Sequence, residues 1–243
     1  MQKETEHWYA EWFDTPYYHI LYKDRDYEEA GQFMNHLTEF LKLQPGDTIL
    51  DLACGRGRHS KYLNSLGYDV TGVDLSQSSI AFAKQFENET LHFDVHDMCC
   101  PYSRKFDAVF NLFTSFGYFK DAEDNLRTIT SIKEDLKPNG HGVIDFLNAE
   151  YVANNLVPQE VKEVDGIQFN IQRGIEDGDI IKRISFTDNG REYNFIERVK
   201  ALTLEDFNRY FDRAGITLEY CFGDYQLTQF HEQTSERLIL IFR

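Results

Sequence analysis

The chain has 243 residues, enough to bury a substantial core in one domain or in one domain with an insertion. Its composition is globular, with 42% hydrophobic and 27% charged residues, and its formal net charge is -16. Nucleic-acid-binding proteins usually present a basic face to phosphates, so the acidic balance argues against a nucleic-acid partner. The chain shows no signal peptide, no apolar stretch near the ~18 residues of a membrane span, and no C-x-x-C pair. We therefore expect a cytoplasmic protein with structural thiols, no membrane partner and no metal site.

The N-terminal segment is rich in aromatic residues. Eight aromatic side chains lie within residues 1–27, Tyr18 and Tyr22 among them. Such a segment can form a lid over a site or simply cover the edge of a sheet. From residue 26 to residue 41 the apolar residues follow helical spacing, and a Pro-Gly-Asp turn ends that pattern.

From residue 48 onward, short apolar runs alternate with helical patterns. The runs at 48–53, 69–73, 91–95, 106–113 and 141–147 predict buried strands, whereas 58–66, 76–86 and 121–136 predict helices. The link from 97 to 105 is short for a crossover, so we expect no helix there. This alternation is typical of a mostly parallel sheet covered by helices on both faces, an α/β fold of the Rossmann-like type.

The pattern changes after residue 155. Runs at 161–164, 167–175, 180–186 and 192–199 are joined by two Asp-Gly pairs and one Asn-Gly pair, which favour hairpin turns. We interpret residues 156–201 as an inserted antiparallel sheet. The α/β pattern then returns with a helix at 203–214 and strands at 217–222 and 236–242. The predicted organisation is a lid and cofactor-binding part over 1–155, the insertion over 156–201, and completion of the α/β domain over 202–243.

A glycine-rich turn follows the first predicted strand. Residues 51–57 read Asp-Leu-Ala-Cys-Gly-Arg-Gly, and glycines at such a position let the backbone turn sharply and approach a ligand. Alone, the turn is ambiguous. Residues 55–60 nearly spell a dinucleotide fingerprint and fail only at its last glycine, so a nicotinamide-dependent oxidoreductase is one alternative.

Three aspartates narrow the interpretation. Asp51, Asp74 and Asp97 are spaced evenly, one for each of the first three strand-helix units. Asp74 and Asp97 follow their strands, where open α/β sheets bind ligands, and a carboxylate after the second strand suits a ribose diol. The other two acids suit a ligand that offers an ammonium group and an exocyclic amine rather than a pyrophosphate. Each aspartate alone could merely cap a turn or a helix.

Residues 51–57 resemble the glycine-rich motif of class I S-adenosylmethionine-dependent methyltransferases, including its Ala-Cys-Gly core. The resemblance covers residues 45–147, and the last helix and strand pair fit that family's sheet, which ends in an antiparallel strand. It implies S-adenosyl-L-methionine as cofactor and S-adenosyl-L-homocysteine as product. It also implies contacts to four parts of the ligand: Asp51, Ala53, Gly55 and Gly57 to the methionine part; Asp74 to the ribose; Leu75, Asp97 and Met98 to the adenine; and Asn111, Leu112 and Phe113 nearest the sulfonium. Leu75 and Met98 could instead belong to the core.

The acceptor is less well defined. Residues 111–114 lack the Asn/Asp-Pro-Pro-aromatic motif of the family's DNA and protein methylators, which together with the acidic charge favours in-line transfer to a small-molecule N or O acceptor. An RNA-modifying methyltransferase is the alternative. The N-terminal segment is similar to the tyrosine-rich segment of amino-sugar N-methylators, so Tyr18, Tyr22 and Arg25 are predicted cofactor or substrate contacts. No catalytic residue is predicted. The inserted sheet is expected to roof the substrate cavity or to form a homodimer contact.

Overall fold

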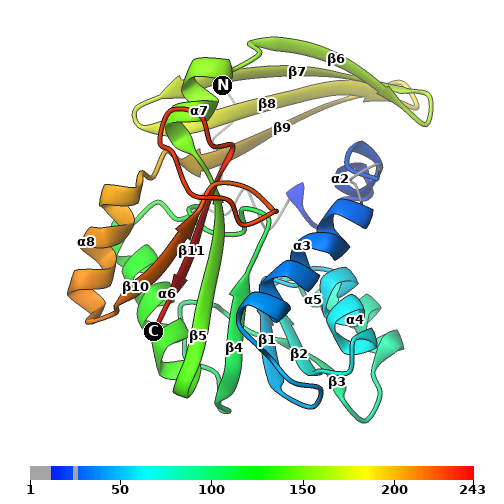
Figure 1. Ribbon diagram of the computed structural model, residues 1–243. Coiled ribbons are helices and arrows are strands. Elements are labelled where there is room, and N and C mark those ends of the chain that lie inside the picture. Colours follow the sequence, from blue (N-terminus) through cyan, green and yellow to red (C-terminus); the bar gives the residue numbers. More distant parts are fainter. Residues whose placement is uncertain (1–11, 24–26) are drawn as a thin grey trace.

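The computed structural model describes residues 12–23 and 27–243, which form two sheets with helices packed around the larger one (Figure 1). The larger sheet has seven strands in the order β10-β11-β5-β4-β1-β2-β3. They are β1 (Thr48–Leu52), β2 (Asp69–Asp74), β3 (Leu91–Val95), β4 (Phe106–Asn111), β5 (Leu136–Leu147), β10 (Leu218–Phe222) and β11 (Arg237–Phe242). Strands β1 to β5 are parallel and β11 runs antiparallel to both β5 and β10, which confirms the predicted fold class.

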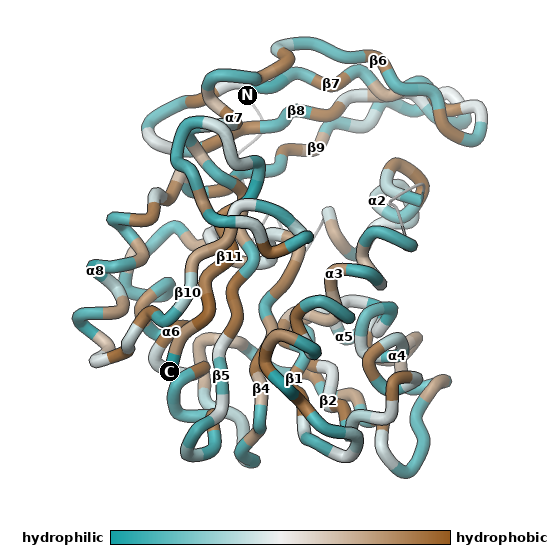
Figure 2. Tube along the Cα trace, viewed as in Figure 1, coloured by the Kyte–Doolittle hydropathy of each residue, from teal (hydrophilic) through white to brown (hydrophobic). Residues whose placement is uncertain are grey.

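Helices cover both faces of this sheet. On one face lie α3 (Tyr27–Phe40), α4 (Arg58–Ser65) and α5 (Gln77–Ala83), which is followed by the short 3-10 helix η1 (Lys84–Phe86). On the other lie α6 (Ala122–Asp135) and α8 (Leu204–Ala214). Each face contributes its own buried cluster, one around Phe33 and Phe110 and the other around Phe146 and Phe207. The strands between the two helical layers are accordingly hydrophobic along much of their length (Figure 2).

The second sheet has four antiparallel strands and lies above the carboxyl ends of the parallel strands (Figure 1). It comprises β6 (Gln159–Val164), β7 (Ile167–Glu176), β8 (Asp179–Asp188) and β9 (Arg191–Lys200). Both residues of each of its three two-residue turns have positive φ, for example Asn189 at 49° and Gly190 at 75°. This is the backbone that matches the twist of a tight hairpin, and it explains why Asp-Gly and Asn-Gly stand there. The predicted antiparallel sheet is thus present.

Several boundaries differ from the prediction. The strand expected at 141–147 begins at Leu136, because a register shift against β4 accommodates the Pro-Asn-Gly segment inside β5. The strand expected to reach residue 113 ends at Asn111, since Phe113 and Thr114 adopt positive φ and leave the sheet. The link from 97 to 105 contains no helix, as expected.

Two short helices were not predicted. In α2 (Pro16–Leu21), the Thr15 side chain accepts a hydrogen bond from Tyr18 N, and proline occupies the first turn. In α7 (Ala149–Asn155), Asn148 caps the helix by accepting from Glu150 N. Both helices are too short for a periodic apolar pattern, so only their caps mark them. Within the described part of the chain, no helix has the length and apolar character to cross a bilayer.

Candidate active site

A cavity of about 1260 Å³ opens at the carboxyl ends of β1, β2, β3 and β4. Turns after β1, β2, β3 and β4 form its floor, residues of α4, α5, η1 and α6 line its sides, and α2 with its flanking residues and one residue of β9 also contribute to the lining. Most of the predicted site residues line it: Tyr18, Tyr22, Asp51, Ala53, Gly55, Asp74, Leu75, Asp97, Met98, Leu112 and Phe113. Gly57 and Asn111 lie behind the lining, and Arg25 lies outside the described residues.

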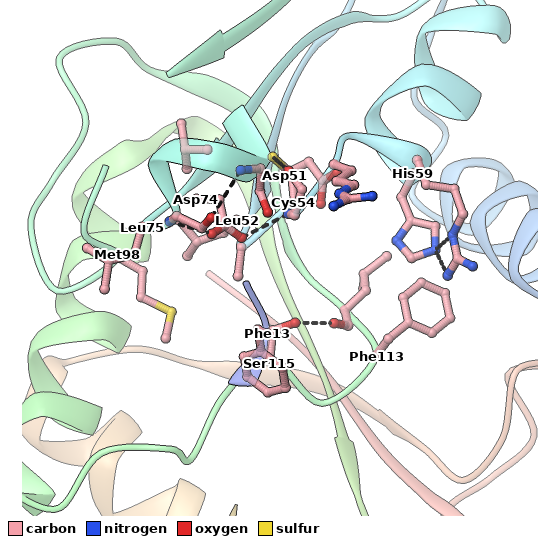
Figure 3. A pocket seen from close by; sticks show the side chains of 18 of the residues that line it. Phe13, Asp51, Leu52, Cys54, His59, Asp74, Leu75, Met98, Phe113 and Ser115 are labelled. Atoms are coloured by element: carbon pink, nitrogen blue, oxygen red, sulfur yellow. Dashed lines mark hydrogen bonds between the residues drawn. The ribbon is translucent and has the colours of Figure 1, made fainter. Parts of the chain in front are cut away.

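Asp74 is held in place at the end of β2 by backbone donors. Gly55 N donates to its Oδ2 and Ser76 N to its Oδ1, each at 2.8 Å (Figure 3). Each carboxylate oxygen can accept a further hydrogen bond, so the pair remains able to bind two vicinal hydroxyls. Burial raises the pKa of Asp74, while the hydrogen bonds from Ser76 and Gly55 oppose the shift.

Asp51 lies at the end of β1 and is almost fully buried, with an exposed fraction of 3%. Ser60 Oγ, from the first turns of α4, donates to its Oδ2 at 2.5 Å. Burial raises the pKa of Asp51 to about 6, against the opposing effect of the Ser60 hydrogen bond. A cationic group placed beside this carboxylate would favour its ionised form, which is the form that an ammonium ligand needs.

The two glycines of the turn have different roles. A Cβ atom on Gly55 would meet nothing within 4 Å, so the backbone there borders open space and a ligand can approach it closely. Gly57 has a φ of 74° and precedes α4, and a Cβ there would lie 2.5 Å from the Phe93 ring. Gly57 therefore serves the packing of the turn against β3.

The far end of the cavity is lined by Leu75, Asp97 and Met98. Leu75 is half exposed, and Asp97 Oδ1 accepts from Cys99 N at 2.9 Å. Asn111 is fully buried, and its Nδ2 donates to Leu52 O at 3.1 Å, tying the end of β4 to the end of β1. Within the described residues its Oδ1 has no hydrogen-bond partner.

Beyond Asn111 the chain adopts a strained conformation. Phe113 and Thr114 have φ of 58° and 59°, a region that costs side-chain-bearing residues energy unless other groups hold them there. Phe113 N donates to Asp145 Oδ2 at 2.7 Å, and Arg237 bonds both Asp145 Oδ1 at 2.8 Å and Thr114 Oγ1 at 2.9 Å. Asp145, on β5, is fully buried. The pair of Asp145 and Arg237 was not predicted from the sequence, although an aspartate inside the apolar run at 141–147 is a visible sign of a buried charge.

The segment around α2 forms the lid side of the cavity, lined by Phe13, Tyr18, His19 and Tyr22. Burial lowers the pKa of His19 to about 4, with Arg56 contributing, and its buried Nε2 has no partner among the described residues. Glu197 of β9 also lines the cavity and accepts a hydrogen bond from Tyr22 OH. Its place in the lining was not predicted, because nothing in the local sequence separates it from the other charged residues of the inserted sheet.

The residues present fit an S-adenosyl group. An open glycine turn, an ionisable carboxylate beside it, and a second carboxylate with free acceptor capacity supply what an amino-acid moiety and a ribose require. Among residues 12–23 and 27–243, no cluster of three or more His, Cys, Asp or Glu side chains is placed to hold a metal ion.

Comparison with known proteins identifies the family. Residues 49–140 match a family model described as a methyltransferase domain. The dTDP-3-amino-3,4,6-trideoxy-alpha-D-glucopyranose N,N-dimethyltransferase of Streptomyces venezuelae is 30% identical over 186 residues, which span 72% of this chain and 78% of the relative.

Solved structures share the fold. A S-adenosylmethionine-dependent methyltransferase of Clostridium acetobutylicum ATCC 824 has a TM-score of 0.78 at 21% identity, over 93% of this chain and 95% of the other. CalS10, an amino pentose methyltransferase from Micromonospora echinaspora solved with S-adenosylmethionine bound, has a TM-score of 0.71 at 16% identity, over 94% and 96% of the two chains. The chain therefore belongs to the class I S-adenosylmethionine-dependent methyltransferases.

Proposed function

We propose that this enzyme methylates an amine or hydroxyl group of a small polar molecule by direct in-line transfer. The observation that carries the proposal is the cavity. Its volume of about 1260 Å³ exceeds the roughly 300–1,000 Å³ of a typical single-ligand pocket, so it can hold a cofactor and an acceptor together. The cavity is lined by the floor turns, by the segment around α2 and by Glu197 of the four-stranded sheet, which favours an acceptor small enough to be enclosed.

Within this cavity the floor residues would hold the cofactor. Asp51 and the Gly55 backbone would bind its amino-acid part, Asp74 its ribose hydroxyls, and Asp97 its adenine amine, with Leu75 and Met98 against the ring. When bound, S-adenosylmethionine supplies an electrophilic methyl carbon. Leu112 and Phe113 would border the acceptor side.

The lid and the four-stranded sheet would provide orientation and exclude water, so that transfer need not depend on a dedicated base. Amino-sugar methyltransferases among the relatives support a small-molecule acceptor. Two roles of the four-stranded sheet remain predictions: that it covers the substrate, and that it forms a homodimer contact.

The test combines binding with turnover. Isothermal titration with S-adenosylhomocysteine should show binding, whereas NADH should not compete. Release of S-adenosylhomocysteine should then be measured against paired amine and alcohol metabolites, a dTDP-3-amino sugar included, and against bulk RNA. Turnover on RNA with none on small molecules would contradict the proposal and favour the RNA-modifying alternative.

A further inference from the structure

We propose that Glu197 determines acceptor specificity and selects small molecules that present an alkylammonium group. The inference rests on the proposed function and narrows its acceptor from amines or hydroxyls to amines. It follows from two features of the acceptor side of the cavity: one carboxylate held in place by the lid, and a group of aromatic rings beside it.

Glu197 is the only residue of the four-stranded sheet that lines the cavity, counting the described residues. Its side chain is 18% exposed. Oε1 accepts two hydrogen bonds, from Trp12 Nε1 and from Tyr22 OH, each at 2.7 Å. Two donors from opposite ends of the lid therefore fix the orientation of this carboxylate.

The second oxygen of Glu197 forms an ion pair with a lysine but makes no hydrogen bond among the described residues. In the described part of the chain Oε2 accepts no hydrogen bond, and the Lys182 Nζ atom lies 3.7 Å from it. Lys182 does not line the cavity, and its ammonium group also bonds Tyr22 OH. A ligand ammonium reaching Oε2 would make a charge-assisted hydrogen bond at a site that is already mostly desolvated. Its proton can pass along that bond to Oε2, which frees the nitrogen lone pair to form the N–CH₃ bond as the bond between the methyl carbon and sulfur breaks and S-adenosylhomocysteine leaves.

Aromatic rings line the same cavity as this carboxylate, and the Lys182 ammonium already lies over one of them, Tyr22, at 4.5 Å from the ring centroid. The Tyr18 ring lies 4.9 Å from Phe13 and 5.0 Å from Tyr22, and Phe13 lies 5.4 Å from Tyr118. All four rings line the cavity together with Glu197. Aromatic faces attract organic cations through their quadrupoles, and aromatic rings around an alkylammonium are a common means of recognising it. A neutral hydroxyl gains neither the ring attraction nor the charge-assisted bond, so the site discriminates between the two acceptor types.

The experiment needs no knowledge of the natural acceptor. Sinefungin carries a protonated amine on the carbon that replaces the sulfur of S-adenosylhomocysteine, so it places a cation on the acceptor side of the cofactor. Isothermal titration gives the dissociation constants of sinefungin and of S-adenosylhomocysteine. Their ratio is measured for the wild type, for Glu197→Gln and for Glu192→Gln. Glutamine keeps an oxygen for Trp12 and Tyr22, and Glu192 is an exposed glutamate on the same strand, so the control removes the same charge elsewhere.

We expect Glu197→Gln to lower the preference for sinefungin about tenfold, the loss of one charge-assisted contact, while Glu192→Gln leaves it unchanged. Lys182→Gln, which removes the competing cation, should raise that preference and gives a second readout of opposite sign. If both ligands bind and the ratio in Glu197→Gln stays within about twofold of the wild type, the inference is wrong while the methyltransferase function stands. If the wild type binds neither ligand, the cofactor site itself is refuted, and the inference with it.

Discussion

The ion pair between Asp145 and Arg237 offers a direct test of how the acceptor end of β4 is held. Asp145 is fully buried, and its carboxylate accepts from both Phe113 N and the Arg237 guanidinium. Replacing Arg237 with methionine keeps most of the side-chain volume and leaves a buried carboxylate without its counter-ion. Breaking a buried pair in this way typically costs about 3–5 kcal/mol. For a chain of this length that corresponds to a fall in melting temperature of about 6–20 °C.

The loss of stability in Arg237→Met should depend on pH. Burial already raises the pKa of Asp145 above its unfolded value, and the Arg237 guanidinium opposes that shift. Without the guanidinium the pKa rises further, so the folded variant binds a proton more tightly than the unfolded chain does. The destabilisation is then fully present above the folded-state pKa and is relieved as the pH falls through it.

The measurement is urea unfolding followed by circular dichroism at a series of pH values, for the wild type, Arg237→Met, Asp145→Asn and the double variant. We expect the double variant to recover much of the loss, because it buries no unpaired charge. A loss below about 1 kcal/mol in Arg237→Met that does not change with pH would refute the reasoning.

Three further outcomes test the cofactor side of the site. Asp74→Ala should weaken S-adenosylhomocysteine binding about 10- to 100-fold by titration calorimetry, because the carboxylate that would accept the ribose hydroxyls is lost; a change under about twofold would contradict its role. Burial raises the pKa of Asp51 to about 6, so this affinity should fall as the pH decreases through that value, and Asp51→Asn should abolish the dependence. Gly57→Ala should cost about 2 kcal/mol or more in urea unfolding, since its Cβ would lie 2.5 Å from Phe93; Gly46→Ala, with φ of 90° and nothing within 4 Å, serves as the control for backbone strain alone.

The floor of the site could be predicted from the sequence because its determinants are local. Asp51, Asp74 and Asp97 lie at or just beyond the ends of strands whose apolar character is visible in a short window, and parallel strands bring their carboxyl ends to one edge of the sheet. Asp51 and Asp74 consequently reach the same cavity although they are far apart in the chain. Gly57 shows the limit of this reasoning, since only the position of the Phe93 ring reveals that this glycine serves packing rather than ligand approach.

The acceptor side could not be predicted in the same way, because its geometry depends on pairs that are distant in sequence. Arg237 reaches Asp145 across 92 residues, and Glu197 reaches Trp12 across 185. The local sequence around a single aspartate or glutamate in a strand does not indicate such a distant partner. The strained backbone at Phe113 is likewise a consequence of the Asp145 carboxylate rather than of any local preference.

The same contacts bear on how acceptor specificity can change within this fold. Trp12 and Leu21 of the lid are buried in one hydrophobic cluster with Phe169 and Phe186 of the four-stranded sheet, so lid and sheet pack as a unit. The lid also contacts the cofactor floor, where Asp14 accepts hydrogen bonds from the hydroxyl groups of Ser76 and Ser78. Exchanging the sheet alone between relatives would leave the lid's indole and phenol donors without their carboxylate, a loss that buried donors tolerate poorly. Acceptor preference should therefore transfer only when lid and sheet are exchanged together, while the cofactor floor stays as it is.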